Sequence, residues 1–230
     1  MTSSWRLEQG LQRLARARLE HADAMALAER EPGAGEAALR ESLGTYWSAM
    51  NWLDMGPDFD AAHEELHLVG RVARRWFASG CRIGFSNGGY GDTCPVVLAH
   101  NRFGISIGFT GNAVCSICGG DDFECEHFPG RSYRVRASVV DGRCNVCAAE
   151  SCGNHSPGEL YEAQAIVVVT KASVDEISIV ADPAQPDARL TWVSVSTAEI
   201  KRVVGSGFEV GDEVRCDYCL HPCGGMVRID

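Results

Sequence analysis

Most cysteines of this 230-residue chain lie in three short clusters, each of which begins with two cysteines separated by two residues. Such a spacer lets one tight turn present two thiolates to one metal ion, and Zn²⁺ binds four thiolate or imidazole ligands tetrahedrally. The clusters consist of Cys115, Cys118, Cys125 and His127; Cys144, Cys147, Cys152 and His155; and Cys216, Cys219 and Cys223, with His221 inside the last loop. The sequence therefore predicts two to three bound zinc ions.

The first two clusters are complete sets of three cysteines and one histidine. A catalytic zinc keeps one coordination position open, so complete sets favour structural zinc. The third cluster has three cysteines, and its fourth ligand is open between His221 and the two remaining cysteines, Cys81 and Cys94. Each of those two could also be a simple buried thiol.

A different metal motif lies upstream, where His63, Glu64 and His67 form an H-E-x-x-H sequence. On a helix, positions i and i+4 share one face, so both imidazoles could bind one zinc ion while the glutamate activates a water molecule. No third histidine follows between Arg71 and Trp76. The motif therefore predicts either a zinc metalloprotease or a pair of histidines that pack on a helix surface.

Composition limits where such a chain works and what it binds. The charged segment from Ser3 to Arg30 does not resemble an export signal, which predicts a cytoplasmic protein whose thiols are reduced and available for metal. No apolar run is long enough to span a membrane. The formal charge of −10 disfavours nonspecific binding to nucleic acid and leaves a protein substrate or protein partner as the expectation.

The first third of the chain shows helical periodicity. Apolar residues recur on one face in three segments, which run from Leu7 to Leu14, from Leu39 to Met50 and from Phe59 to Phe77. The pairs Pro32-Gly33 and Gly56-Pro57 separate these segments. The pattern predicts three helices in a helical domain over residues 1–79.

From Cys81 onward the sequence pattern changes to short apolar or alternating runs between turn residues. This pattern predicts a β-rich domain over residues 80–230. The run from Ile166 to Val169 is apolar on both faces and predicts a central strand. The glycine-rich stretch from Gly84 to Gly91 predicts a hairpin turn. The expected strands are 81–85, 96–99, 104–109, 133–140, 163–170, 176–180 and 190–195. The fold class is thus α+β, with metal knuckles in the loops of the β-rich part.

Two segments of this β-rich part carry short motifs in a fixed order. Residues 104–109 read GISIGF, and residues 176–180 read EISIV before a proline- and alanine-containing turn over residues 182–189. Over residues 103–196 the chain resembles the phage prohead (capsid maturation) serine proteases, some of which carry a C-x2-C-G and C-E-H knuckle after the serine motif. The first cysteine cluster stands in that order here.

The resemblance implies a prohead-protease-like fold and a serine endopeptidase that cuts a protein substrate. Ser106 matches the position of the nucleophile, and Glu176 lies in the segment that packs near it. A serine hydroxyl needs a neighbouring base to remove its proton. His100 has the local sequence context of that base, although it lies only six residues before Ser106. The alternative is an inert zinc-binding interaction module of the same fold, in which Ser106 is an ordinary residue of a strand.

Overall fold

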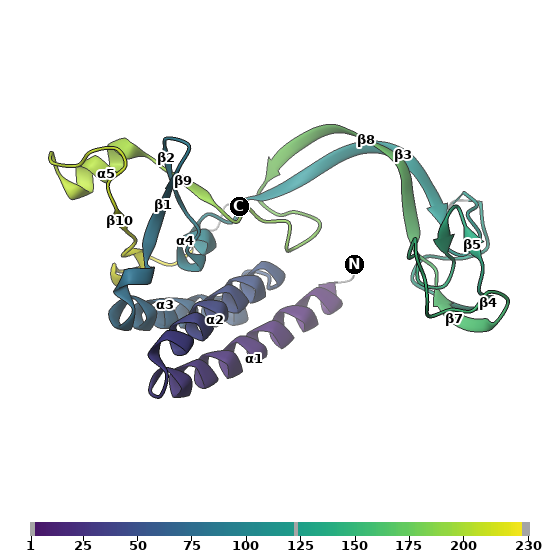
Figure 1. Cartoon of the computed structure of the whole chain (residues 1–230), viewed down its shortest axis with the longest axis horizontal. Coiled ribbons are helices and arrows are strands. Elements are labelled where there is room, and N and C mark those ends of the chain that lie inside the picture. The colour runs from purple at the N-terminus through teal and green to yellow at the C-terminus, as the bar shows by residue number, and fades with distance from the viewer. Residues whose placement is uncertain (1–2, 122–123, 227–230) are drawn as a thin grey trace. The chain divides into compact units, whose positions relative to one another are not determined.

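A computed structural model describes residues 3–121 and 124–226 of the chain, which form two compact units. Unit 1 comprises Met1–Ser106 and Ile179–Asp230, and unit 2 comprises Ile107–Ser178. The architecture is α+β, as predicted, with three helices followed by a β-rich region (Figure 1). In the described residues, no helix has both the length and the apolar character needed to cross a membrane.

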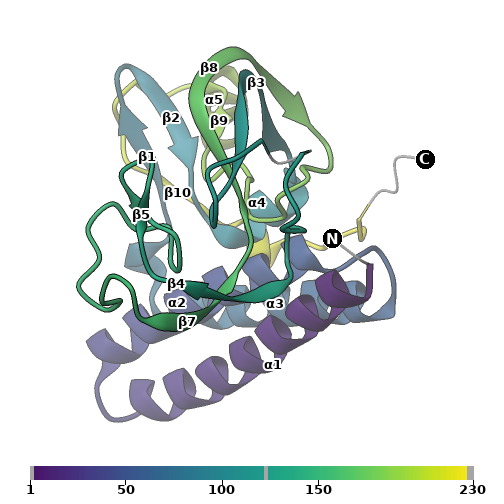
Figure 2. The same ribbon diagram turned by 90° about the vertical axis from the view of Figure 1, so that its right-hand side faces the viewer.

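Three helices form one layer of unit 1, and they confirm the periodicity of the sequence. They are α1 (Ser3–Ala28), α2 (Pro32–Trp52) and α3 (Pro57–Trp76), and they lie side by side in two perpendicular views (Figures 1 and 2). A proline at the first position starts both α2 and α3, where the missing N–H costs no helical hydrogen bond. The apolar faces meet in a core that includes Leu39, Tyr46 and Leu66, all almost completely buried.

A four-stranded antiparallel sheet forms the second part of unit 1, in the order β10-β1-β2-β9. Its strands are β1 (Arg82–Ser86), β2 (Gly89–Asp92), β9 (Val193–Val195) and β10 (Val214–Arg215). Asn87 and Gly88 have φ of 51° and 77° in the turn between β1 and β2, which confirms the predicted hairpin. A small core around Tyr90 joins the sheet to helix α5 (Thr197–Val204).

One predicted strand is a helix. Residues 96–99 were expected to be extended but belong to α4 (Pro95–His100). Pro95 starts the helix, and Val96 and Ala99, three residues apart, both enter the core of the helical layer. A run of four apolar residues has no clear period, so burial against the helices decides its structure.

Unit 2 consists of three two-stranded sheets and the loops between them. Its strands are β3 (Gly104–Cys115) with β8 (Val167–Val180), β4 (Ser132–Arg136) with β7 (Leu160–Gln164), and β5 (Val139–Val140) with β6 (Arg143–Cys144). The predicted central strand at Ile166–Val169 is wrong. Ile166 and Val169 are 45% and 43% exposed, because β8, which begins at Val167, pairs with β3 alone among the described strands and is exposed along most of its length.

The two units do not follow the domain boundary expected between residues 79 and 80. Strands β9 and β10 lie after residue 178 but pair with β2 and β1, so the four-stranded sheet belongs to the same unit as the helices. Arg189, only 6% exposed, strengthens that unit by donating hydrogen bonds to the carbonyl oxygens of Arg102 and Ala181 at 2.7 and 2.6 Å. Unit 2 is the segment between Ile107 and Ser178.

Candidate metal centres

The first knuckle, formed by Cys115, Cys118, Cys125 and His127, brings four possible ligand atoms within 4.8 Å of one another. Cys115 ends β3, and the tight turn that follows directs the backbone N–H groups of Cys118 and Ile117 at its sulfur. Burial opposes ionisation of Cys115, but these donors outweigh it and lower the pKa of the thiol. The turn thus stabilises the thiolate form that binds metal.

His127 is fixed by an aromatic neighbour and has a free ligand atom. Its ring meets the ring of Tyr133 edge to face, with centroids 4.8 Å apart, and the Tyr133 hydroxyl accepts the N–H of Phe128 at 2.8 Å. The Nδ1 atom of His127 is buried and makes no hydrogen bond with the described residues. A buried ring nitrogen beside three thiols fits a metal ligand.

The second knuckle, formed by Cys144, Cys147, Cys152 and His155, has the same construction. The N–H groups of Val146 and Cys147 point at the Cys144 sulfur and lower its pKa against the effect of burial. The Nδ1 atom of His155 lies 3.2 Å from Cys152 Sγ and 3.6 Å from Cys144 Sγ, and the sulfurs of Cys147 and Cys152 are 3.6 Å apart. A tetrahedral zinc site has N–S edges of about 3.6 Å and S–S edges of about 3.8 Å.

Each knuckle also has its own tyrosine, which contacts the histidine and which cysteine spacing did not reveal. Tyr161 meets the ring of His155 at 4.7 Å and accepts the N–H of Ser156 at 3.1 Å, as Tyr133 does for His127 and the residue after it. Each tyrosine follows its histidine by six residues, which was the available signal. The tyrosines stand on β4 and β7, which pair antiparallel, so one ladder orients both histidines.

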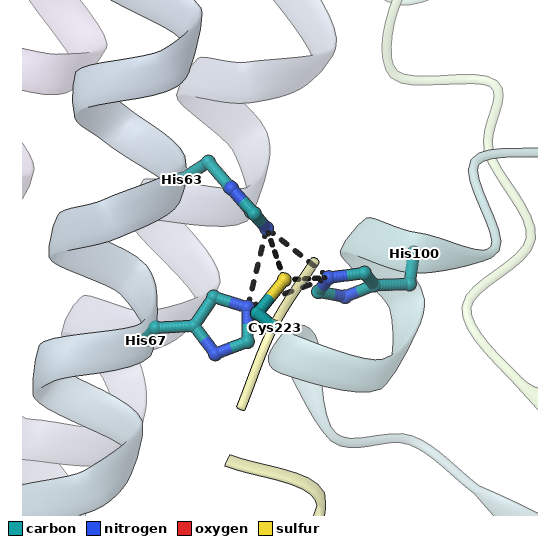
Figure 3. A group of neighbouring side chains, drawn as sticks. All are labelled: His63, His67, His100 and Cys223. Atoms are coloured by element: carbon teal, nitrogen blue, oxygen red, sulfur yellow. Dashed lines mark hydrogen bonds between the residues drawn. The ribbon is translucent and has the colours of Figure 1, made fainter. Parts of the chain in front are cut away.

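A third set of ligands, termed here the histidine centre, assembles in unit 1 from His63, His67, His100 and Cys223. His63 and His67 lie one turn apart on α3, His100 ends α4, and Cys223 comes from the segment after the short helix η2 (Tyr218–Leu220) (Figure 3). All four side chains point toward one common position. The H-E-x-x-H motif therefore does place both its histidines at a metal-type site, with ligands that lie far away in the sequence.

The distances in the histidine centre are those of a metal tetrahedron. The three Nε2 atoms are 3.1, 3.2 and 3.4 Å apart, and Cys223 Sγ lies 3.1 Å from His100 and 3.6 Å from His63. Zinc–nitrogen bonds near 2.0–2.1 Å and a zinc–sulfur bond near 2.3 Å require N–N edges of about 3.3 Å and N–S edges of about 3.6 Å. The residues fit a zinc ion at their centre.

Protonation in the histidine centre also suits a metal. The carbonyl of Val96 accepts a hydrogen bond from His100 Nδ1 at 2.8 Å, which leaves the Nε2 lone pair of the neutral ring free for a ligand bond. Burial and the neighbouring imidazoles lower the pKa of His63 and bring that of His67 to about 4. Three neutral rings whose Nε2 atoms converge cannot all hydrogen-bond one another, since each such bond needs one N–H and one lone pair.

The residues of the predicted third cluster do not form one metal site but have different partners. Cys223 joins the histidine centre, whereas Cys216 lies beside Asp92 and Cys94. The remaining two predicted ligands have other partners: the Cys219 thiol donates to the Gly70 carbonyl at 3.2 Å, and exposed His221 lies 3.5 Å from Asp217. Cys219 lies within η2, between Cys216 and Cys223, and distant ligands from α3 and α4 complete the site that Cys223 joins.

Ser106 is exposed on β3. The proposed base, His100, has other partners for both ring nitrogens, namely the histidine centre and the carbonyl of Val96. Glu176 lies on β8, where a Cβ atom added to Gly108 would come within 2.6 Å of its Cγ. Among the described residues, no hydrogen bond joins Ser106 and His100.

Glu64 is exposed on α3, and its charge acts on His63 to raise the pKa slightly against the larger effects of burial. Its neighbour Glu65 instead accepts hydrogen bonds from Arg18 at 2.7 and 2.9 Å, which ties α3 to α1. Of these two neighbouring glutamates, Glu64 is therefore the one whose carboxylate is not held by Arg18 and is available to act on a ligand.

Comparison of the chain with protein-family models, with curated proteins and with solved structures found no match. The fold and the sites define a two-unit α+β chain with two sets of three cysteines and one histidine and one set of three histidines and one cysteine, each of which could hold a metal ion.

Proposed function

We propose that this chain is a zinc-binding protein-interaction module whose zinc ions are structural. The observation that carries the proposal is that all three sets offer four protein ligands within 4.8 Å. A closed tetrahedral set leaves no position for a substrate or a catalytic water molecule. The zinc ions then serve to hold loops in a shape that a protein partner can recognise.

The composition of unit 2 supports a structural role. Among the described residues, its buried core cluster consists of Cys115, Ile117, Ala163 and Ala165, and a few partly buried side chains pack against it, among them Tyr133, Val135 and Val146. Such a small apolar core does not offset the conformational entropy lost when loops become ordered. Metal binding supplies folding free energy directly where no preformed core exists. The knuckles are therefore expected to be the main source of order in unit 2.

The test of closed sites is cobalt substitution followed by a challenge with a small ligand. Tetrahedral Co²⁺ with thiolate ligands has intense visible absorption, and acetohydroxamate changes that spectrum only where a coordination position is open. The challenge uses the Cys94→Ser chain, because Asp92, Cys94 and Cys216 form a further group with three ligand atoms that would leave one position open. We expect no change for that chain, which keeps every ligand of the three sets. Adding Cys223→Ala to it gives the matched positive control, because this change vacates one position of the histidine centre and should make its spectrum respond.

A second candidate function is a metal-dependent peptidase at the histidine centre. Its support is that Cys223 is the one exposed ligand of the centre and comes from a segment without regular structure. If Cys223 left, His63, His67 and His100 would still hold the zinc ion, which would supply a Lewis acid and lower the pKa of a bound water molecule. Glu64, exposed beside His63, would then accept the proton of that water.

One pair of results separates the two candidates. A Cys94→Ser spectrum that changes with acetohydroxamate, together with peptide hydrolysis that is lost in Glu64→Gln, would favour the peptidase and overturn the structural proposal. An unresponsive spectrum and no hydrolysis favour closed sites.

The serine-peptidase hypothesis and the prohead-protease resemblance stay predictions. The engagement of His100 in the histidine centre argues against it as the base for Ser106. Covalent labelling of Ser106 by a fluorophosphonate probe, measured on zinc-loaded protein, would nevertheless restore the hypothesis, and absence of labelling would remove it.

A further inference from the structure

We infer that unit 1 holds a second metal ion, bound by Asp92, Cys94 and Cys216. The carboxylate and the two sulfurs lie within 4.8 Å of one another. Two thiolates and a carboxylate suit zinc or a divalent ion of similar softness. The inference concerns residues outside the three sets that support the proposed function, so it does not depend on that proposal.

Backbone geometry delivers the three residues to one place. Asp92 ends β2, and its carboxylate accepts the N–H of Cys94 at 2.7 Å, which sets the turn into α4. Cys216 follows β10, where its N–H donates to the Cys81 carbonyl at 3.0 Å and its own carbonyl accepts from Arg74 Nε at 3.1 Å. The sheet, α3 and α4 thus position the backbone of all three residues.

Burial and charge make these residues unusual without a cation. Asp92 and Cys216 are 3% and 7% exposed. In the part of the chain that the structure describes, the Asp92 carboxylate forms no ion pair with a lysine or arginine, and Cys94 N–H is the donor it has. A buried carboxylate next to two thiols is costly unless a positive charge compensates it, and a divalent ion provides that charge.

The proposed site and the histidine centre take ligands from the same two segments of the chain. Cys94 precedes α4 and His100 ends it, while Cys216 and Cys223 lie on either side of η2. One metal ion at each end would therefore clamp α4 to the segment that carries η2. This arrangement explains why Cys216 and Cys223 diverge although their spacing suggests one cluster.

The test is metal counting by native mass spectrometry on reduced, zinc-loaded full-length chains. We expect four zinc ions in wild type, three in Cys94→Ser and three in Cys216→Ser, in accord with four candidate groups. His221→Ala is the matched control on the same segment and should retain four, because the exposed His221 side chain pairs with Asp217 and belongs to none of the candidate groups.

Three results would overturn the inference. The first is a wild-type count of three with the ligands of the other sets all protected from alkylation. The second is a count that stays at four in both cysteine variants. The third is a wild-type mass lower by two hydrogens with a Cys94–Cys216 disulfide in the peptide map. The first and third results are measured on the wild-type chain, so they test the inference even if a variant fails to fold.

Discussion

Replacing Cys115 by serine is expected to unfold unit 2 while the helices of unit 1 remain. The relevant magnitudes come from the core of unit 2, whose fully apolar buried members are Ile117, Ala163 and Ala165. Burial of one isoleucine and two alanine methyl groups contributes roughly 3–5 kcal/mol, and the partly buried Tyr133, Val135 and Val146 add roughly 2–4 kcal/mol. One structural zinc site contributes about 10–16 kcal/mol in zinc-finger peptides. Metal binding therefore outweighs apolar burial, and loss of one ligand removes more than the core can replace.

The assay is two-dimensional amide NMR of the full chain, combined with zinc content and limited proteolysis. In Cys115→Ser, resonances of residues 107–178 should collapse to random-coil positions, and cleavage should concentrate in that segment. Resonances of α1, α2 and α3 should stay dispersed, because their core lies in unit 1. Cys81→Ser is the matched control, since Cys81 contacts Arg40 and belongs to none of the four candidate groups.

A Cys115→Ser chain that keeps its zinc content, its dispersed spectrum and its melting temperature would refute this reasoning. Such a result would mean that the first knuckle is not a metal site, or that strand pairing alone holds unit 2. Collapse of both units together would refute the narrower claim that they fold separately.

Three further predictions concern single groups. In the metal-free chain, the pKa of His67 is about 4 in the fold against 6.5 for a free histidine. The stability from its neutral form is therefore present above pH 6.5 and lost as pH falls towards 4, and urea midpoints of the metal-free chain at pH 7 and 5 measure this. Tyr161→Phe leaves the N–H of Ser156 without its acceptor and should destabilise unit 2 by about 1 kcal/mol in chemical denaturation. Ser106→Ala should leave the melting temperature and zinc content unchanged, because this exposed side chain supports neither; a shift of several degrees would contradict that view.

The helices and the knuckles were accessible to sequence reasoning because their determinants are local. Helical periodicity and the breaks at Pro32 and Pro57 define α2 and α3 without reference to the rest of the chain. The two knuckles likewise place all their ligands within one short loop, so spacing alone predicts the groups that the structure brings together. The zinc in them remains a prediction that metal analysis must decide.

The errors fall where tertiary context decides. Residues 96–99 and 166–169 are both short apolar runs, yet one becomes a buried helix and the other an exposed strand. Nothing within either run distinguishes them. The first packs against α2 and α3, whereas the second pairs with β3 alone among the described strands. A run of four residues is too short for hydrophobic periodicity to distinguish a helix from a strand, so long-range packing determines the structure of each run.

The histidine centre was likewise not predicted as a set of four ligands, because these ligands lie far apart in the sequence. Cys223 lies 160 residues from His63, whereas His155 lies 11 residues from Cys144. Loop-closure entropy grows as the logarithm of loop length, so closing the longer loop costs about 2 kcal/mol more. The knuckles can close before the rest of the chain is ordered, but the histidine centre has to wait until α3 and α4 are packed. Ligand sets that are hard to see in a sequence are thus the ones whose assembly depends on the completed fold.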